Sequence, residues 1–298
     1  MYTSSIQIDG KLKSVEDYLG EIIGMPLGVS ELEKAIDRLS EAERWTTGNA
    51  ETVACLKGEE WNFKSKGSAD TLVRLARRGS VQVVQDFVAA GTPLNGKDEA
   101  GQTALMVAAY RGDVEILRVL LVAGAAKQDS SGFGTDGRTL LMTAAVSGVP
   151  SVVEDVLKNH RDVNAQDKQG RTALMEAVGQ YHFGPESPEI HRAEVVRLLL
   201  QAGADPNLSD ENGNTALIET AWDADAALLL IRAGSNLNAQ NNKGITPLMN
   251  CAGPEVVRVL LAHGADRSIR DADGQTALES AKERGMKDKV AALSTKDH

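Results

Sequence analysis

The sequence predicts a mainly α-helical solenoid of about seven helix-turn-helix and hairpin repeats, behind a small α+β module at the N-terminus. Two observations carry this prediction: glycines recur at fixed intervals over residues 67–298, and the apolar residues between them follow helical spacing. A third is that aromatic residues make up only 4% of the 298-residue chain. So few aromatics suit a thin core built from Ala, Leu and Val.

Two series of glycines alternate along the repeats. In the first series each glycine is followed by one residue and then Thr: Gly101, Gly137, Gly170, Gly213, Gly244 and Gly274. In the second series each glycine closes a Leu- and Val-rich stretch: Gly91, Gly124, Gly203, Gly234 and Gly264, with Asn159-His160 in the equivalent place once. Because glycine readily adopts φ > 0, this alternation predicts a helix end, a polar hairpin and a new helix in every repeat.

A threonine stands at each predicted start of a first helix: Thr103, Thr139, Thr172, Thr215, Thr246 and Thr276. Its side-chain oxygen can accept a hydrogen bond from the unpaired N–H groups there. Two short helices cannot bury their apolar faces alone, so the repeats must stack. The last repeat, Ala277–Leu293, is charged along its second helix, including Lys289, and is expected to face solvent as a cap.

The strings GQTALMVAA, GRTLLMTAA, GRTALMEAV, GNTALIETA, GITPLMNCA and GQTALESA resemble the ankyrin-repeat family, from about residue 68 to residue 293. The family pattern T-P-L-H-x-A becomes T-A-L-M-x-A, and only Thr246-Pro247 keeps the proline. The family histidine is replaced by Met106, Met142, Met175, Ile218, Met249 and Glu279, so mostly apolar packing is expected there. The resemblance implies protein binding through a concave face of hairpin tips and inner helices.

Residues 1–66 match no family, so we predict two domains, 1–66 and 67–298. Ile6 and Ile8 alternate with polar residues and predict a strand. Capping-box patterns at Ser14 and Ser30 predict two helices, and residues 53–63 around Gly58 predict a hairpin. This module is either a cap on the first repeat or a recognition element that supplies part of a binding surface.

Composition argues against several classes of function. Lys and Arg number 32 against 42 Asp and Glu, a formal net charge of −10; an acidic chain repels phosphate backbones, so no nucleic acid is expected as partner. The cysteines Cys55 and Cys251 have no metal-site spacing, so no metal and no cofactor is predicted. The chain shows neither a secretory pattern nor a run of 18 apolar residues. We therefore expect a cytoplasmic protein, with no membrane partner, that is a monomer on its own.

Apparent catalytic motifs are also unconvincing. Residues 132–137 spell G-x-G-x-x-G, but a polar stretch precedes them and Gly137 belongs to the hairpin series, so a dinucleotide site is not predicted. The five histidines form no HExxH motif, and no serine or cysteine stands in a nucleophile elbow. We predict no catalytic residues and no enzyme.

Departures from the regular repeat mark candidate partner-binding residues. The third hairpin carries three extra residues around Phe133, and ten residues are inserted in the fourth repeat, where Tyr181, His182 and Phe183 lie. Repeats five and six are shorter than the others, which predicts clipped first helices.

The resemblance adds further residues of the concave face: Tyr110, Arg111, Glu176, Glu219, Trp222 and Asp223. Glu176 and Glu219 occupy one variable position in adjacent repeats, so we expect them about 10 Å apart. With Asp223 they would form an acidic patch beside Trp222, and tryptophan is frequent among binding hot spots.

The leading hypothesis is a protein–protein interaction module that binds one protein partner through its concave face and its aromatic insertion. Within it we favour an inhibitor or immunity protein that neutralises a basic bacterial toxin, because the chain is acidic and carries no effector chemistry. The alternative is an effector or signalling adaptor that engages a host or regulatory protein. An enzyme that uses the N-terminal module is disfavoured, since residues 1–66 contain no histidine.

Overall fold

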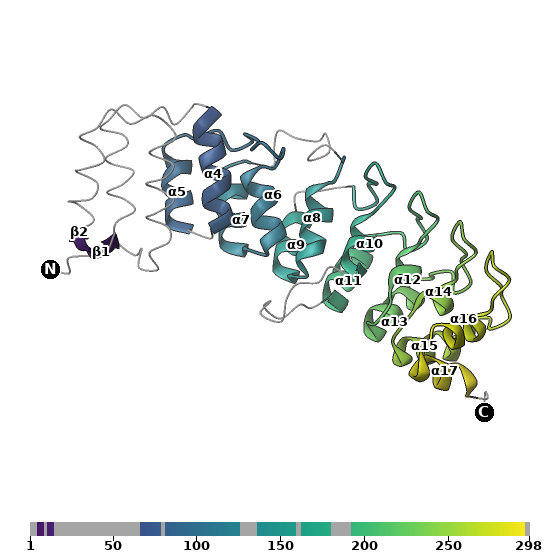
Figure 1. Cartoon of the computed structure of the whole chain (residues 1–298). Helices are drawn as coiled ribbons and strands as arrows, with labels where there is room; N and C mark the ends of the chain where they lie inside the picture. The colour runs from purple at the N-terminus through teal and green to yellow at the C-terminus, as the bar shows by residue number, and fades with distance from the viewer. Residues whose placement is uncertain are drawn as a thin grey trace. The chain divides into compact units, whose positions relative to one another are not determined.

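The structure, a computed structural model, describes residues 5–8, 11–14, 66–78, 81–125, 136–158, 162–179 and 192–295. The chain forms two compact units, Met1–Ser130 and Ser131–His298. Seven pairs of antiparallel helices occupy the described ranges from residue 66 onward (Figure 1). The prediction of a mainly helical chain of about seven repeats is confirmed.

The described residues of the first unit form a two-stranded antiparallel sheet and two helix pairs. Strands β1 (Ser5–Ile8) and β2 (Lys11–Ser14) pair with Ser5 opposite Ser14. The inner helices α4 and α6 pack side by side, as do the outer helices α5 and α7. Their bounds are Lys66–Arg78 for α4, Val81–Ala89 for α5, Ala104–Arg111 for α6 and Val114–Val122 for α7.

The N-terminal predictions are tested only in part. Strand β1 spans the alternating residues Ile6 and Ile8, whereas its partner β2 was not predicted. The helices expected after Ser14 and Ser30 and the hairpin around Gly58 lie outside the described residues. The α+β module and the boundary at residues 66 and 67 therefore stay predictions.

The second unit stacks five further helix pairs. The inner helices α8, α10, α12, α14 and α16 pack in chain order, and the outer helices α9, α11, α13, α15 and α17 form a second layer behind them. The inner helices are Leu140–Ser147, Ala173–Val178, Ala216–Glu219, Pro247–Asn250 and Ala277–Glu283. The outer helices are Pro150–Leu157, Arg192–Gln201, Ala224–Arg232, Pro254–Ala262 and Lys287–Ser294. The four-residue helices α12 and α14 confirm the clipping predicted for repeats five and six.

The predicted helix starts are confirmed at atomic detail. In six inner helices the threonine at the N-cap accepts a hydrogen bond from the backbone N–H three residues later, at 3.2 to 3.4 Å. Both glycine series adopt positive φ, 71 to 77° before the threonines and 87 to 94° at the ends of the outer helices. The position held by Asn159-His160 lies outside the described residues.

Backbone hydrogen bonds link successive hairpins of the second unit into a ladder. Lys168 N donates to Asp136 O, and Glu211 N donates to Gln169 O, both at 2.9 Å. Two further bonds of the same length join the next hairpins: Asn242 N to Asn212 O, and Ala272 N to Lys243 O. The hairpins consequently project side by side along one edge of this unit (Figure 1).

The core lies between the two helix layers and follows the repeat pattern. Residues at the family-histidine position are buried where apolar: Met106, Met142, Met175, Ile218 and Met249 are 0 to 8% exposed. The expected apolar packing is therefore present. Glu279, at the same position in the last repeat, instead accepts from the N–H of Thr276 at 2.8 Å and completes a capping box.

The last helix departs from the expected solvent-facing cap at Lys289. Its side chain is only 2% exposed, although Lys287 and Asp288 beside it are exposed. Nζ donates to Met249 O and to Cys251 O, both at 2.6 Å. The short helix α14 ends at Asn250 and leaves carbonyls near its C-terminus unpaired within the helix. Lys289 satisfies two of them and ties α17 to repeat six.

Candidate protein-binding face

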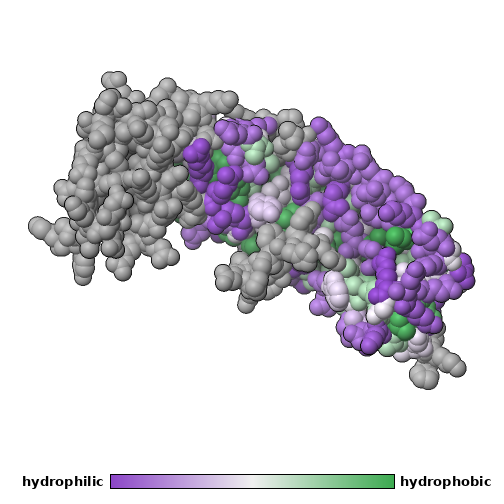
Figure 2. All heavy atoms as spheres, in the orientation of Figure 1, coloured by the Kyte–Doolittle hydropathy of each residue, from purple (hydrophilic) through white to green (hydrophobic). Residues whose placement is uncertain are grey.

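Side chains that project from the hairpins and inner helices of the second unit form one polar surface, which we call the inner face. Its central residues are Arg138, Arg171, Glu176, Glu219, Trp222 and Asn250. Glu176, Glu219 and Asn250 each stand four residues after a helix-start threonine, so stacking of the repeats places them in neighbouring positions. Figure 2 shows hydrophilic residues along the hairpin edge of this unit.

Four charges of alternating sign run across three repeats of the inner face. Arg138 Nη2 donates to Glu176 Oε2 at 2.6 Å, and Arg171 Nε donates to Glu176 Oε1 at 2.6 Å. Arg171 also forms a bidentate pair with Glu219, at 2.8 and 2.9 Å. The Glu176 side chain is 1% exposed and that of Glu219 is 17% exposed. Each carboxylate is therefore bound by at least one guanidinium group.

The two glutamates stabilise the protonated form of the Arg171 guanidinium. Burial alone lowers the pKa of its guanidinium, but hydrogen bonds and the charges of Glu219 and Glu176 outweigh burial and raise that pKa. The acidic patch predicted from Glu176, Glu219 and Asp223 is therefore wrong. Arginines from the preceding hairpins neutralise the two glutamates, and Oδ1 of Asp223 accepts from Ala226 N at 2.9 Å as the N-cap of α13.

Trp222 is the exposed aromatic of this surface. It follows the clipped helix α12, and its side chain is 64% exposed. A Cβ atom added to Gly253 of the next repeat would lie 3.5 Å from Trp222 Cε3, so a side chain at position 253 would contact the indole edge. Gly253 and Gly179 hold the same position as Trp222 in the flanking repeats, seven residues after the threonine. The indole therefore has no bulky side chain at the equivalent position on either side.

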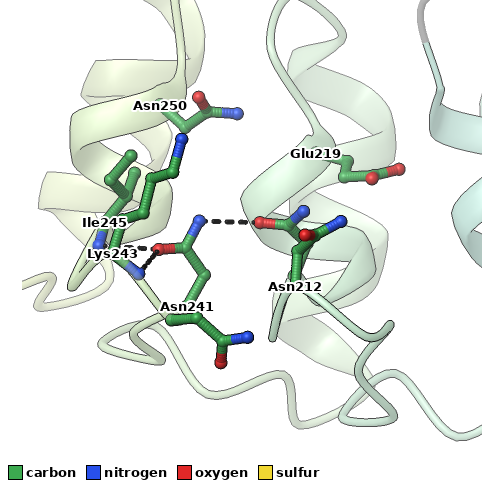
Figure 3. A pocket seen from close by; sticks show the side chains of 8 residues that line it. Asn212, Glu219, Asn241, Lys243, Ile245 and Asn250 are labelled. Carbon is green, nitrogen blue, oxygen red and sulfur yellow. Dashed lines mark hydrogen bonds between the residues drawn. The ribbon is translucent and has the colours of Figure 1, made fainter. Parts of the chain in front are cut away.

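A hollow of about 400 Å³ lies between repeats five and six on the inner face (Figure 3). It is lined by Asn212, Asn214, Glu219, Asn241, Asn242, Lys243, Ile245 and Asn250. Asn241 Oδ1 accepts from the backbone N–H groups of Lys243 and Ile245, and its Nδ2 donates to Asn214 Oδ1 at 2.8 Å. Asn250 Nδ2 donates to Ile218 O at 2.8 Å. The walls are thus ordered by hydrogen bonds to the backbone.

The other residues predicted to bind a partner are distributed over both units. Tyr110, 48% exposed, and Arg111, also exposed, end helix α6 in the first unit. Four predicted residues lie outside the described ranges: Phe133, Tyr181, His182 and Phe183. The roles of all of these residues in binding stay predictions.

Sequence reasoning missed the asparagine-lined hollow. One signal in the sequence could have indicated it. Asn250 stands at the repeat position that Glu176 and Glu219 occupy in the preceding repeats, so its side chain is expected on the same face. A second was the acidic or amide residue three positions before the hairpin glycine. In the last four hairpins Oδ1 of this residue accepts from the N–H groups two and four residues later, as in Asp210 with Asn212 and Asn214.

Two features are absent from the described part of the chain. No group of three or more His, Cys, Asp or Glu residues there could hold a metal ion. No helix in the described ranges has the length and apolar character needed to cross a membrane.

These stacked helix pairs with a polar hairpin face define a repeat protein of the ankyrin type. A family model described as ankyrin repeats (3 copies) matches residues 42–131, 72–167, 123–210, 186–266 and 220–298. The chain belongs to the ankyrin-repeat family, and ankyrin repeats are protein–protein interaction modules.

Other ankyrin-repeat proteins are similar to this chain in sequence. Ankyrin repeat and SOCS box protein 6 of Homo sapiens is 27% identical over 207 residues, which cover 69% of this chain and 45% of that protein. Putative ankyrin repeat protein YahD of Escherichia coli strain K12 is 31% identical over 135 residues, 45% of this chain and 63% of that protein. The chain therefore spans less than two thirds of either relative.

A solved structure is also similar. The ankyrin repeat domain of Bcl-3, described as a unique member of the IkappaB protein family, aligns with a TM-score of 0.54 and 26% identity. The alignment covers 75% of this chain and 97% of that domain.

Proposed function

We propose that the chain binds one protein partner through its inner face, with Trp222 as the principal anchor. The observation that carries this proposal is the 64% exposure of the Trp222 side chain on a surface of ordered polar residues. Tryptophan is enriched among hot spots, and its rigid ring loses little conformational entropy on binding. Because residue 253 of the next repeat is glycine, no side chain at that position covers the indole edge.

The charged side chains around Trp222 support binding because ion pairs fix their positions, more than through the net charge of the surface. Arg138 and Arg171 both pair with Glu176, and Arg171 also pairs with Glu219, so a partner meets prearranged groups and immobilises few flexible side chains. In this proposal the buried Glu176 positions the two arginines. Tyr110 and Arg111 of the first unit, and the Phe133 and Tyr181–Phe183 segments, are proposed as additional contacts.

Within this role we propose an inhibitor that neutralises a basic toxin. The formal net charge of −10 favours association with a cationic protein by long-range attraction. An adaptor that engages a regulatory protein is the competing outcome, and the identity of the captured partner separates the two. A stoichiometric loss of the partner's toxic activity on mixing is expected for the inhibitor.

Affinity capture from the native cell tests the proposal. The bait is the full chain, compared with Trp222→Ala and with a control, Val122→Ala, which truncates an apolar residue that is 89% exposed on outer helix α7. Loss of a hot-spot tryptophan costs about 2 kcal/mol or more, roughly thirtyfold in Kd. One partner should be retained by the wild type and the control and lost from Trp222→Ala. Equal capture by all three baits would refute the inner face as the site.

A further inference from the structure

The hollow between repeats five and six has the chemistry of a receptor for a negatively charged group. Its lining contains one cation, Lys243, and one carboxylate, Glu219. Both oxygens of Glu219 are taken by the guanidinium of Arg171. Lys243 is exposed, and its Nζ makes no hydrogen bond or ion pair with the described residues. The charge left for a ligand is therefore positive.

The amide groups of the hollow favour the same kind of ligand. The oxygen of Asn241 accepts two backbone N–H groups, and the oxygen of Asn214 accepts from Asn241, so both oxygens are occupied within the protein. Each side-chain NH₂ group carries two protons, and Asn214 and Asn241 each donate one of them, to Asp210 Oδ2 and to Asn214 Oδ1 respectively. Asn212 adds an amide side chain that makes no hydrogen bond within the described residues. The oxygens of Asn212, Asn242 and Asn250 accept no hydrogen bond within the described residues, but the three protons of the Lys243 ammonium group and the remaining amide protons outnumber these oxygens.

The side chains are also arranged around one space. In Figure 3 the ammonium group of Lys243 extends along the inner helix toward Asn250, while the carboxylate of Glu219 is directed away from the hollow. Asn212 and Asn241 lie at the hairpin end of the same space. A ligand oxygen between them would meet a cation on one side and amide donors on the other.

We propose that this hollow binds the side-chain carboxylate of an Asp or Glu residue of the protein partner, with Lys243 as its counter-ion. The inference rests on the proposed function, because it names the chemistry that the inner face selects. Charge-assisted hydrogen bonds from an ammonium group are about twice as strong as neutral ones. An acidic anchor here would fix the register of a partner on a chain whose formal net charge of −10 repels acidic proteins at long range.

Peptide selection against the full chain tests this proposal. Short random peptides are displayed as internal segments, so that they carry no terminal carboxylate, and are selected on the immobilised protein. Enriched sequences are synthesised with N-acetyl and C-amide ends, and Kd is measured by fluorescence anisotropy. We expect an Asp or Glu at a fixed position, whose change to Asn or Gln weakens binding at least about tenfold.

Protein variants then locate the carboxylate. Lys243→Met should weaken the acidic peptide about tenfold and should abolish the difference between the Glu and Gln peptides. Lys282→Met is the matched control, since Lys282 is exposed on α16 and does not line the hollow. It should leave Kd unchanged.

Two results would overturn the inference. One is a selection without an acidic consensus, and the other is an acidic peptide that binds Lys243→Met as tightly as the wild type. Peptides that depend on Trp222 but not on a carboxylate would leave the proposed inner-face function standing and remove only this inference. Peptides that depend on neither would remove both.

Discussion

Replacing Arg171 by Met tests whether the alternating charges of the inner face are a structural unit. The substitution keeps the aliphatic part of the side chain and removes three hydrogen bonds to carboxylates, one to Glu176 and two to Glu219. Arg138 still pairs with Glu176, whereas Glu219 loses the guanidinium that binds both of its oxygens.

The cost follows from burial. Breaking a fully buried ion pair costs about 3 to 5 kcal/mol, because the remaining charge stays desolvated. The side chains of Arg171 and Glu219 are 21% and 17% exposed, so solvent compensates part of this loss. We expect the free energy of unfolding to fall by about 2 to 4 kcal/mol.

Urea unfolding followed by circular dichroism measures this loss, together with the slope m, because stacked repeats can unfold in more than one step. The matched control is Arg270→Met, which breaks an Arg–Glu pair of 2.9 Å whose side chains are 57% and 51% exposed. That pair is screened by solvent and its loss should fall within experimental error. Equal destabilisation by the two substitutions would refute the argument from burial.

Three further predictions concern the repeat framework. Gly213→Ala should destabilise the protein by about 2 kcal/mol or more beyond Gly264→Ala, as measured by chemical unfolding. Both glycines have positive φ, but only at Gly213 would a Cβ meet another residue, Asn242 Oδ1 at 2.8 Å. Thr172→Ala should cost about 1 kcal/mol in the same assay through loss of the N-cap; a loss as large as that of Arg171→Met would contradict a simple cap. Burial raises the pKa of the Cys251 thiol from 9.0 to about 11, so the folded chain keeps a proton that the unfolded chain releases. Stability should therefore fall from pH 9 to 11, by roughly 3 kcal/mol at most. Burial lowers the pKa of Lys289 and acts in the opposite direction, so the test compares unfolding of the wild type with Cys251→Ala; identical pH profiles would count against the thiol.

Features of the framework that depend on one turn of chain could be predicted from the sequence. The positive φ of glycines such as Gly170 and the capping by threonines such as Thr172 follow from the residue and its immediate neighbours. The clipped helices α12 and α14 follow from shortened intervals between the glycines. Repetition of these local signals in six of the seven repeats predicted the fold before any contact was known.

The ion pairs of the candidate site could not be predicted, because the paired residues are far apart in the sequence. Glu176 and Glu219 suggested an exposed acidic patch, because the reach of Arg138 and Arg171 from other turns of the chain cannot be read from spacing. A long, flexible arginine side chain can reach several carboxylates, and the packing of the repeats determines which ion pair forms.

The sequence by itself therefore determined the helices, hairpins and stacking of the repeats, since these follow from local backbone preferences and apolar periodicity. Tertiary structure alone decided which charges are neutralised and where a hollow remains. Lys289 shows the reason most directly: the two residues before it are exposed, yet carbonyls about forty residues away bind its ammonium group in the interior. Burial of a polar side chain is decided by the groups that meet it in space, and in this protein those groups come from other repeats.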